Sequence, residues 1–98
     1  MVVPVFAVIS FEWDEGNREK NFLKHRVTVD ECEQAFFNTP FLAHDDIDHS
    51  QREERWFALG QTKLNRKLYI AFTMRADKIR IISARDMDKL ERRIYDQA

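Results

Sequence analysis

Arginine and aromatic residues recur along the second half of this 98-residue chain, where they could bind a ligand that carries phosphate. Trp56, Arg75 and Arg80 stand out because all three fall in stretches that alternate like strands. A guanidinium pairs with phosphate through two parallel hydrogen bonds, and a ring stacks on an unpaired base. Residues 52–98 hold twelve Lys and Arg against seven carboxylates, whereas residues 1–51 hold four against ten. This asymmetry indicates a basic surface, although an ordinary solvated surface is the alternative.

Side chains of this kind could cut RNA without a metal ion. The 2′-hydroxyl attacks the adjacent phosphorus, so the protein must accept a proton, protonate the leaving oxygen and stabilise an anionic transition state. Arginine suits the last role because its charge is permanent and its donors form a fixed fork. The sequence does not show which of its proton-transfer groups converge: Lys24, His25, Glu54, Glu91 and Tyr95.

The segment His44-Asp-Asp-Ile-Asp-His49 offers two imidazoles and three carboxylates, which is the chemistry of a metal site. Its ligands are hard and mixed, and its spacing matches no established metal-binding pattern. We therefore expect a solvated loop or strand end, no metal and no other cofactor. A metal-dependent hydrolase built on this segment is kept as an alternative hypothesis. The chain has no Gly-rich phosphate loop.

Length and composition predict one compact domain over residues 1–98, with 44% hydrophobic residues, two Gly and two Pro. No apolar run approaches the roughly 18 residues of a membrane span, so we expect no membrane contact. The apolar residues 1–10 lack the basic start and cleavage site of a signal peptide, and we interpret them as an N-terminal extension or edge strand. The lone Cys32 excludes an internal disulfide, fits the cytoplasm and is expected in the core of a helix.

Two helices are predicted in the first half. Thr28-Val-Asp-Glu31 reads as a capping box that begins the more certain one, and Asn38-Thr39-Pro40 ends it. A shorter helix from Glu15 to His25 precedes it, with Phe22 and Leu23 turned inward.

The second half reads as strands and a final helix. The strand candidates, after a first one through Phe11-Glu-Trp13, are Phe41–Asp46, Glu54–Thr62, Lys67–Arg75 and Lys78–Arg85. The last helix is expected after a cap at Asp86 or Asp88, with three residues on its inner side: Met87, Leu90 and Ile94.

Two hairpins then set the faces of the sheet. A two-residue turn at 76–77 places Thr73 opposite Arg80, and a four-residue turn at 63–66 places Trp56 opposite Thr73. One face is apolar: Phe57, Leu59, Ile70, Phe72, Met74, Ile79 and Ile81. The other is mixed: Trp56, Tyr69, Thr73, Arg75, Lys78, Arg80 and Ile82.

On the mixed face, Trp56, Thr73 and Arg80 form a predicted row about 10 Å long, comparable to one or two nucleotides. In the alternative interpretation, Trp56 and Ile82 pack under the last helix and the arginines make surface ion pairs. The fold class we expect is α+β, an antiparallel sheet with the order β-α-α-β-β-β-β-α and its helices packed on one face.

Four segments of the chain resemble the BrnT toxin family: Phe11-Glu-Trp-Asp14, Asn21-Phe-Leu-Lys-His25, Asp48-His-Ser-Gln-Arg-Glu-Glu-Arg55, and Arg80-Ile-Ile-Ser-Ala-Arg85 with Glu91-Arg-Arg-Ile-Tyr95. They run in the family's order from residue 11 to residue 95. The resemblance implies a RelE-like ribonuclease fold and RNA cleavage that arrests growth. It also implies a cognate ribbon–helix–helix antitoxin, BrnA-like, through which the pair contacts DNA.

The resemblance implies candidate catalytic residues at six positions: Lys24, His25, Glu54, Arg80, Arg85 and Tyr95. Glu91 also matches, and the candidate RNA-binding residues are Arg55, Trp56, Arg75 and Lys78. Asn17 and Arg26 depart from the family's usual lysine and glycine, and Arg26 suggests that the turn between the helices needs no positive φ. A toxin-fold protein that binds antitoxin or RNA without cutting it is therefore a second hypothesis. We expect the antitoxin to cover the basic face.

Overall fold

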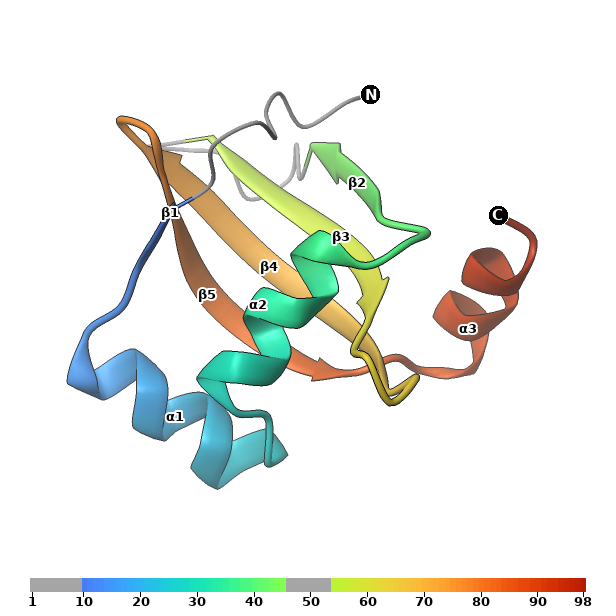
Figure 1. Cartoon of the computed structure of the whole chain (residues 1–98), viewed down its shortest axis with the longest axis horizontal. Coiled ribbons are helices and arrows are strands. Elements are labelled where there is room, and N and C mark those ends of the chain that lie inside the picture. Colours follow the sequence, from blue (N-terminus) through green and yellow to red (C-terminus); the bar gives the residue numbers. More distant parts are fainter. Residues whose placement is uncertain (1–9, 46–53) are drawn as a thin grey trace.

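The computed structural model describes residues 10–45 and 54–98, apart from the side chains of residues 17, 18, 21 and 23. Five strands form one sheet in the order β1-β5-β4-β3-β2 (Figure 1). No helix in the described ranges is long and apolar enough to cross a membrane. The elements along the chain are β1 (Ser10–Glu12), α1 (Glu15–His25), α2 (Val29–Phe37), β2 (Leu42–Asp45), β3 (Arg55–Gln61), β4 (Lys67–Arg75), β5 (Lys78–Asp86) and α3 (Lys89–Asp96).

The sheet is mostly antiparallel, but β1 pairs with β5 in parallel. The expectation of a wholly antiparallel sheet is therefore wrong at this edge. The chain reaches β5 from β1 only after two helices and three other strands, and a connection of that length permits parallel pairing where a hairpin does not. The fold is α+β.

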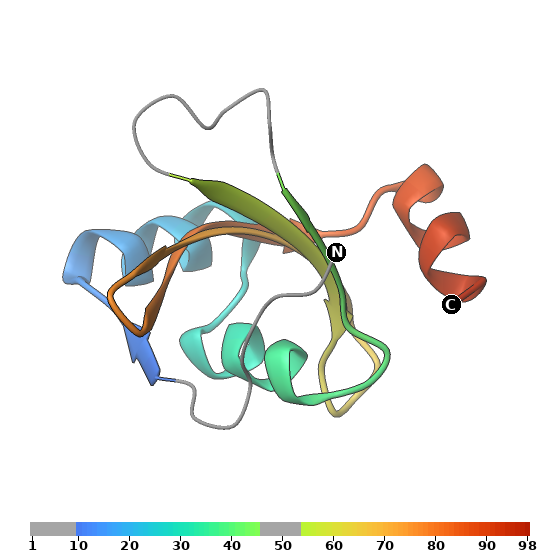
Figure 2. The same ribbon diagram turned by 90° about the horizontal axis from the view of Figure 1, so that it is seen from above.

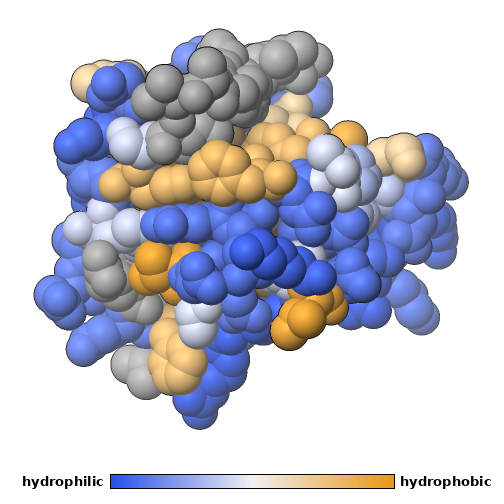
Figure 3. All heavy atoms as spheres, viewed as in Figure 1, coloured by the Kyte–Doolittle hydropathy of each residue, from blue (hydrophilic) through white to orange (hydrophobic). Residues whose placement is uncertain are grey.

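Helix α2 packs across the middle of the sheet and closes the main core. Its capping box is present, since the Thr28 hydroxyl accepts from the Glu31 amide at 3.1 Å and the Glu31 carboxylate accepts from the Thr28 amide at 3.0 Å. Cys32, Ala35 and Phe36 point into the core, which confirms the expected place of the cysteine. The surface seen from this side is largely hydrophilic, with hydrophobic side chains in one band and in smaller separate patches (Figure 3).

Helix α1 has the predicted bounds, but Phe22 on it is exposed rather than turned inward. The turn after it also differs from expectation, because Arg26 has a φ of 57°. The prediction that this turn needs no positive φ is wrong. An arginine takes the left-handed conformation here, at a cost that glycine would avoid.

The pairing of β3 with β4 is displaced by one residue from the predicted register. Trp56 lies opposite Phe72, not opposite Thr73. Gly60 explains the shift, because a Cβ built on it would lie 3.0 Å from the Ala35 carbonyl oxygen of α2. Gly60 must therefore face α2. Because alternate residues of a strand share a face, Trp56, four residues before Gly60, faces α2 as well.

Trp56 is consequently a core residue, 8% exposed and stacked on Phe72. Its predicted place on the mixed face is wrong. The same shift moves Arg55, Phe57 and Leu59 to the sheet face opposite α2, which we call the outer face.

The pairing of β4 with β5 confirms the predicted turn, since Thr73 lies opposite Arg80. Beyond this point the register changes, because Phe72 pairs with Ile81 while Ala71 pairs with Ser83. One extra residue therefore bulges on β5. The bulge reverses the alternation, so Arg85, opposite Tyr69, comes to the same face as Arg80.

Helix α3 lies on the other side of the sheet from α2 (Figure 2). There Leu59, Met87 and Tyr95 form a second, smaller core. The prediction that the helices pack on one face is wrong. The predicted inner side of α3 is wrong for Leu90 and Ile94, which are 60% and 51% exposed, whereas Met87 is buried as predicted.

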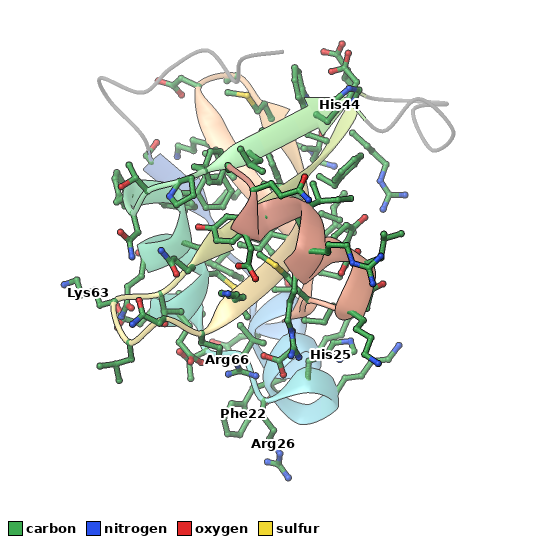
Figure 4. All side chains as sticks on the ribbon, turned by 90° about the vertical axis from the view of Figure 1, so that its right-hand side faces the viewer. Phe22, His25, Arg26, His44, Lys63 and Arg66 are labelled. Carbon is green, nitrogen blue, oxygen red and sulfur yellow. The ribbon has the colours of Figure 1, made fainter. Side chains whose placement is uncertain are left out.

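Arg66, in the turn between β3 and β4, ties four segments of the chain together (Figure 4). Its guanidinium donates to the Asp86 carboxylate at 2.7 and 3.2 Å and to the Glu31 carboxylate at 3.1 Å. It also donates to the backbone carbonyls of His25 and Arg26, at 3.1 and 2.8 Å. The end of α1, the start of α2 and the end of β5 are thereby held to one planar group.

These contacts change the acidity of both carboxylates. Hydrogen bonds from Arg66 lower the pKa of Asp86. Burial acts to raise the pKa of Glu31, but hydrogen bonds from Thr28 and Arg66 outweigh it and leave the pKa lowered. A carboxylate with a depressed pKa stabilises the fold above its unfolded-state pKa, and this contribution is lost as the pH falls through the folded-state value.

We expect Arg66→Ala to lower the free energy of unfolding by about 2 kcal/mol at pH 7, since it leaves two carboxylates and two carbonyls without their donor. The difference from the wild type should narrow as the pH falls below about 4, where the carboxylates become protonated. Urea unfolding at several pH values measures both effects. Arg93→Ala, which removes an exposed charge from α3, is the control. If Arg66→Ala lowers the free energy of unfolding by the same amount at every pH, the contacts of Arg66 with the two carboxylates are not what stabilises the fold.

The turn between β4 and β5 gives a second prediction. Ala76 has a φ of 55°, a conformation that L side chains with a Cβ adopt at a cost. Because Ala76 is exposed, Ala76→Gly should raise the free energy of unfolding by up to about 1 kcal/mol, and Ala76→Val should lower it. Thermal unfolding of the three proteins tests the order, and a less stable glycine variant would refute it.

Candidate functional site

Three residues form a row across the outer face: Arg55 on β3, Thr73 on β4 and Arg80 on β5. We call it the arginine row. Neighbouring strands are about 4.8 Å apart, so the two arginines stand about 10 Å apart on either side of Thr73. The Thr73 hydroxyl is buried and donates to the Glu54 carbonyl at 2.6 Å, which fixes the start of β3. The predicted row is therefore present with Arg55 in the place assigned to Trp56.

The guanidinium of Arg80 is half-buried and is not part of the hydrophobic core. It donates to the carboxylates of Glu12 and Asp14, each at 3.2 Å. For Arg80 the alternative interpretation, a surface ion pair, is thus correct. An ion pair this exposed is weak, so a phosphate group can compete with the carboxylates for the guanidinium.

Two further cations extend the positive charge of the row. Arg75 and Lys78 are exposed and lie opposite each other at the hairpin end of β4 and β5. Strand alternation places both on the outer face with Thr73 and Arg80. Glu54, which precedes β3, is exposed at the same end of the sheet.

A second set of side chains crosses the outer face beside the arginine row. The ring of His44 on β2 is nearly parallel to that of Phe57, with centroids 5.8 Å apart and planes at 23°. Phe57 is related to Tyr69 in the same way, at 5.8 Å and 18°. The Arg85 guanidinium lies over the Tyr69 ring, 4.1 Å from its centroid. We call these four residues the aromatic row.

Helix α3 holds Arg85 in place. The Glu91 carboxylate accepts from both terminal nitrogens of Arg85, at 2.8 and 2.9 Å, and also caps α3 through the Asp88 amide. Hydrogen bonding to Glu91 raises the pKa of Arg85. Tyr95 is buried, which raises the pKa of its hydroxyl, and the hydroxyl donates to the Pro40 carbonyl. Tyr95 therefore fixes α3 to the sheet.

Lys24 and His25 lie at the far end of β5 from the arginine row. Helix α1 starts directly after Asp14, which contacts Arg80, and ends where the His25 carbonyl meets the Arg66 and Asp86 pair. Arg80 and Arg85 are five residues apart, or about 15 Å along the strand. Figure 4 shows His25 beside Arg66, well away from His44 at the opposite end of the molecule.

The structure thus divides the predicted site residues into two groups along β5. Around the arginine row lie Glu54, Arg55, Arg75, Lys78 and Arg80. At the other end lie Lys24, His25, Arg85, Glu91 and Tyr95. Trp56 belongs to neither, because it is in the core.

Sequence reasoning missed Phe57 and His44 as outer-face residues, and it missed the carboxylates that hold Arg80. Gly60 was the available signal, since its need to face α2 sets the alternation of β3. Most of the segment 44–49 lies outside the described residues. Within 10–45 and 54–98, no cluster of His, Cys, Asp or Glu is suited to a metal ion.

Comparison with known proteins agrees with the earlier resemblance. The family described as ribonuclease toxin, BrnT, of type II toxin–antitoxin systems matches residues 13–91. No individually curated protein matches the chain. The matched range contains both the arginine row and the aromatic row, and membership of a type II system implies an antitoxin as partner. Since the match extends over most of its length, this chain belongs to the BrnT family of ribonuclease toxins.

Proposed function

We propose that the protein is a metal-independent endoribonuclease that arrests growth by cutting RNA in the cytoplasm, and that the arginine row holds the phosphate to be cut. The observation that carries this proposal is the placement of Arg55 and Arg80 on either side of Thr73, on the outer face. If Arg80 exchanges Glu12 and Asp14 for the phosphate, two guanidiniums supply fixed charge where the transition state becomes more anionic.

The reaction needs proton transfer at both ends of the phosphorus. In our proposal the exposed Glu54 carboxylate takes the proton of the 2′-hydroxyl as the bond from O2′ to phosphorus forms. The bond from phosphorus to O5′ then breaks and leaves a 2′,3′-cyclic phosphate. Lys78, exposed on the same face, is our candidate to protonate O5′. All of these groups belong to the protein, so no metal ion is required.

The residues at the other end of β5 are proposed to bind the RNA chain beyond the cut. Lys24 and His25 lie at the end of β5 that carries Arg85, and Arg85 is about 15 Å along the strand from Arg80, so we place these two residues away from the phosphate to be cut. Lys24 is exposed and carries a charge suited to the RNA backbone. A strand of RNA lying along β5 would pass from one group to the other.

We further propose a RelE-like fold and a ribbon–helix–helix antitoxin that carries the DNA contact of the pair. An acidic segment of the antitoxin over the arginine row would block the phosphate site and complement its charge. The exposed Arg75 and Lys78 at the end of the row favour this placement.

The purified protein should cut single-stranded RNA in the presence of EDTA. Arg80→Ala and Arg55→Ala should each reduce the rate of cutting about a hundredfold or more, since each removes one transition-state donor. Arg93→Ala removes an exposed arginine from α3 and should cut normally. Gel analysis of an end-labelled RNA measures the rates, and circular dichroism confirms that the variants are folded.

Intact RNA after incubation with folded wild-type protein would contradict the proposal, as would cutting that EDTA abolishes. Variants at the two ends of β5 test where on the protein the RNA is cut. If Lys24→Ala and His25→Ala abolish cutting but spare RNA binding, while Arg80→Ala has no effect, the cut occurs at the other end of β5.

The ion pairs of Arg80 give a separate prediction. Glu12→Gln removes one carboxylate that competes with phosphate and keeps the shape of the side chain. RNA affinity should therefore increase several-fold at low salt, and the increase should shrink as salt is added. Fluorescence anisotropy with a 2′-O-methylated RNA, which cannot be cut, measures this. Glu19→Gln on the exposed part of α1 is the matched control, and weaker binding by Glu12→Gln would refute the competition.

A further inference from the structure

Resting on the proposed function, we infer that Thr73 is a positioning residue for the cleavage reaction, because its hydroxyl holds the backbone of Glu54, our proposed base, beside the arginine row. Thr73 is the central member of that row, paired with Arg55 on β3 and with Arg80 on β5. Its hydroxyl donates to the Glu54 carbonyl oxygen at 2.6 Å. Thr73 is itself buried, so it acts on the reaction through Glu54 and not by touching the RNA.

Glu54 lies just outside the part of β3 that the sheet holds. Within the described residues, the pairing of β3 with β4 extends from Gln61 to Arg55 and ends there. A residue beyond the last pair of a ladder is not held by the ladder's regular hydrogen bonds. The Thr73 hydroxyl supplies a bond at this point, directly after the β3–β4 pairing has ended.

This hydrogen bond fixes the direction of a rigid group. The Glu54 carbonyl and the Arg55 amide nitrogen belong to one planar peptide unit, so a donor to the carbonyl oxygen holds the α-carbons on both sides. Arg55 is also paired with β4, whereas Glu54 precedes the strand. Loss of the hydroxyl should therefore loosen Glu54 more than Arg55. A general base must lie within hydrogen-bond distance of the proton that it takes, so a loosened Glu54 transfers the proton less often.

The hydroxyl of Thr73 is buried in a strand whose neighbouring residues, Phe72 and Met74, are hydrophobic. Thr73 is only 1% exposed. Burying a hydroxyl costs free energy unless a hydrogen bond compensates for it, and valine has nearly the same shape without that cost. The Glu54 carbonyl is the partner that compensates here. The contact with the backbone before β3 thus accounts for a polar group at this position.

Thr62, which directly follows β3 at its other end, is a matched control. It is 2% exposed, and its hydroxyl accepts from the Arg66 backbone amide at 3.1 Å. It therefore shares with Thr73 the residue type, the degree of burial and a backbone partner. Seven residues separate it from Arg55, which places it about 23 Å from the arginine row. Valine at this position tests what the loss of a buried hydroxyl does to cutting when the site itself is unchanged.

Cutting rates at saturating RNA and the affinity for RNA together test the role of Thr73. Thr73→Val should lower kcat about tenfold, since a base held less firmly misses the geometry of proton transfer. The affinity for a 2′-O-methylated RNA, which cannot be cut, should change less than about twofold because both arginines remain. Thr73→Ser keeps the hydroxyl and should restore most of the rate. Thr62→Val should cut as fast as the wild type.

A double-mutant cycle with Glu54→Gln separates positioning from a purely structural role. If Thr73 acts through the Glu54 carboxylate, adding Thr73→Val should not slow the Glu54→Gln protein further. A threonine that only supports the fold would slow cutting about tenfold in both backgrounds, and that result would overturn the inference. Thr73→Ala, which is smaller and cannot clash, replaces Thr73→Val in the cycle if circular dichroism shows the valine variant to be unfolded.

The inference and the proposed function fail in different ways. If Glu54→Gln cuts as fast as the wild type, the proposed base is wrong. If Glu54→Gln cuts slowly but Thr73→Val cuts as fast as the wild type, the proposed base stands and the inference is refuted.

A measurement without RNA tests the contact itself. Thr73→Val should lower the NMR order parameters of the backbone amides of Glu54 and Arg55, and Thr73→Ser should leave them unchanged. Order parameters that are the same in Thr73→Val and the wild type would refute the inference whatever the rate of cutting, because the hydroxyl would then not hold this backbone in place.

Discussion

The fold depends on how one guanidinium joins segments that are distant in the chain. Arg66 lies in a turn, yet it holds the end of α1, the first turn of α2 and the last residue of β5. A guanidinium has five donors in one plane, and here they meet carboxylates and carbonyls from several directions. Lysine has the charge but not this fixed geometry. Because α1 reaches along β5 toward this point, the same contact decides where Lys24 and His25 lie relative to Arg85.

The close packing of β3 against α2 is a second constraint, and it decides which residues of β3 lie on the outer face. Gly60 lies so near the backbone of α2 that no other residue fits without movement. That contact determines the alternation of β3, and with it which of Arg55 and Trp56 meets the ligand. A tryptophan enters the core and an arginine faces outward. The basic patch of a chain with a net charge of −1 thus arises from packing on the opposite side of the sheet.

Local signals in the sequence predicted the helices and strands well, but they predicted the pairing and packing between these elements less well. The capping box at Thr28 and the turn at Ala76 depend on residues close together in the chain, and both are present. The β3–β4 register depends on a turn whose length is ambiguous by one residue and on a contact with a distant helix. The side of the sheet covered by α3 depends on Tyr95 and Met87 meeting Leu59, which no periodicity reveals. The two arginines of the row were both singled out from the sequence, but only Arg80 was placed correctly.

The bulge on β5 also decides which face each residue after it occupies. If β5 paired without a bulge and kept all its residues, Arg80 and Arg85, five residues apart, would lie on opposite faces of the sheet. The methyl group of Ala84 would then leave the interior, and the charge of Arg85 would enter it in its place. Deleting Ile82 has a different outcome, because it removes the extra residue together with the bulge and keeps the two arginines on the same face. Strand β5 can therefore lose the half-buried Ile82 without turning Arg85 over, whereas β3, which pairs with β4 without an extra residue, has none to lose.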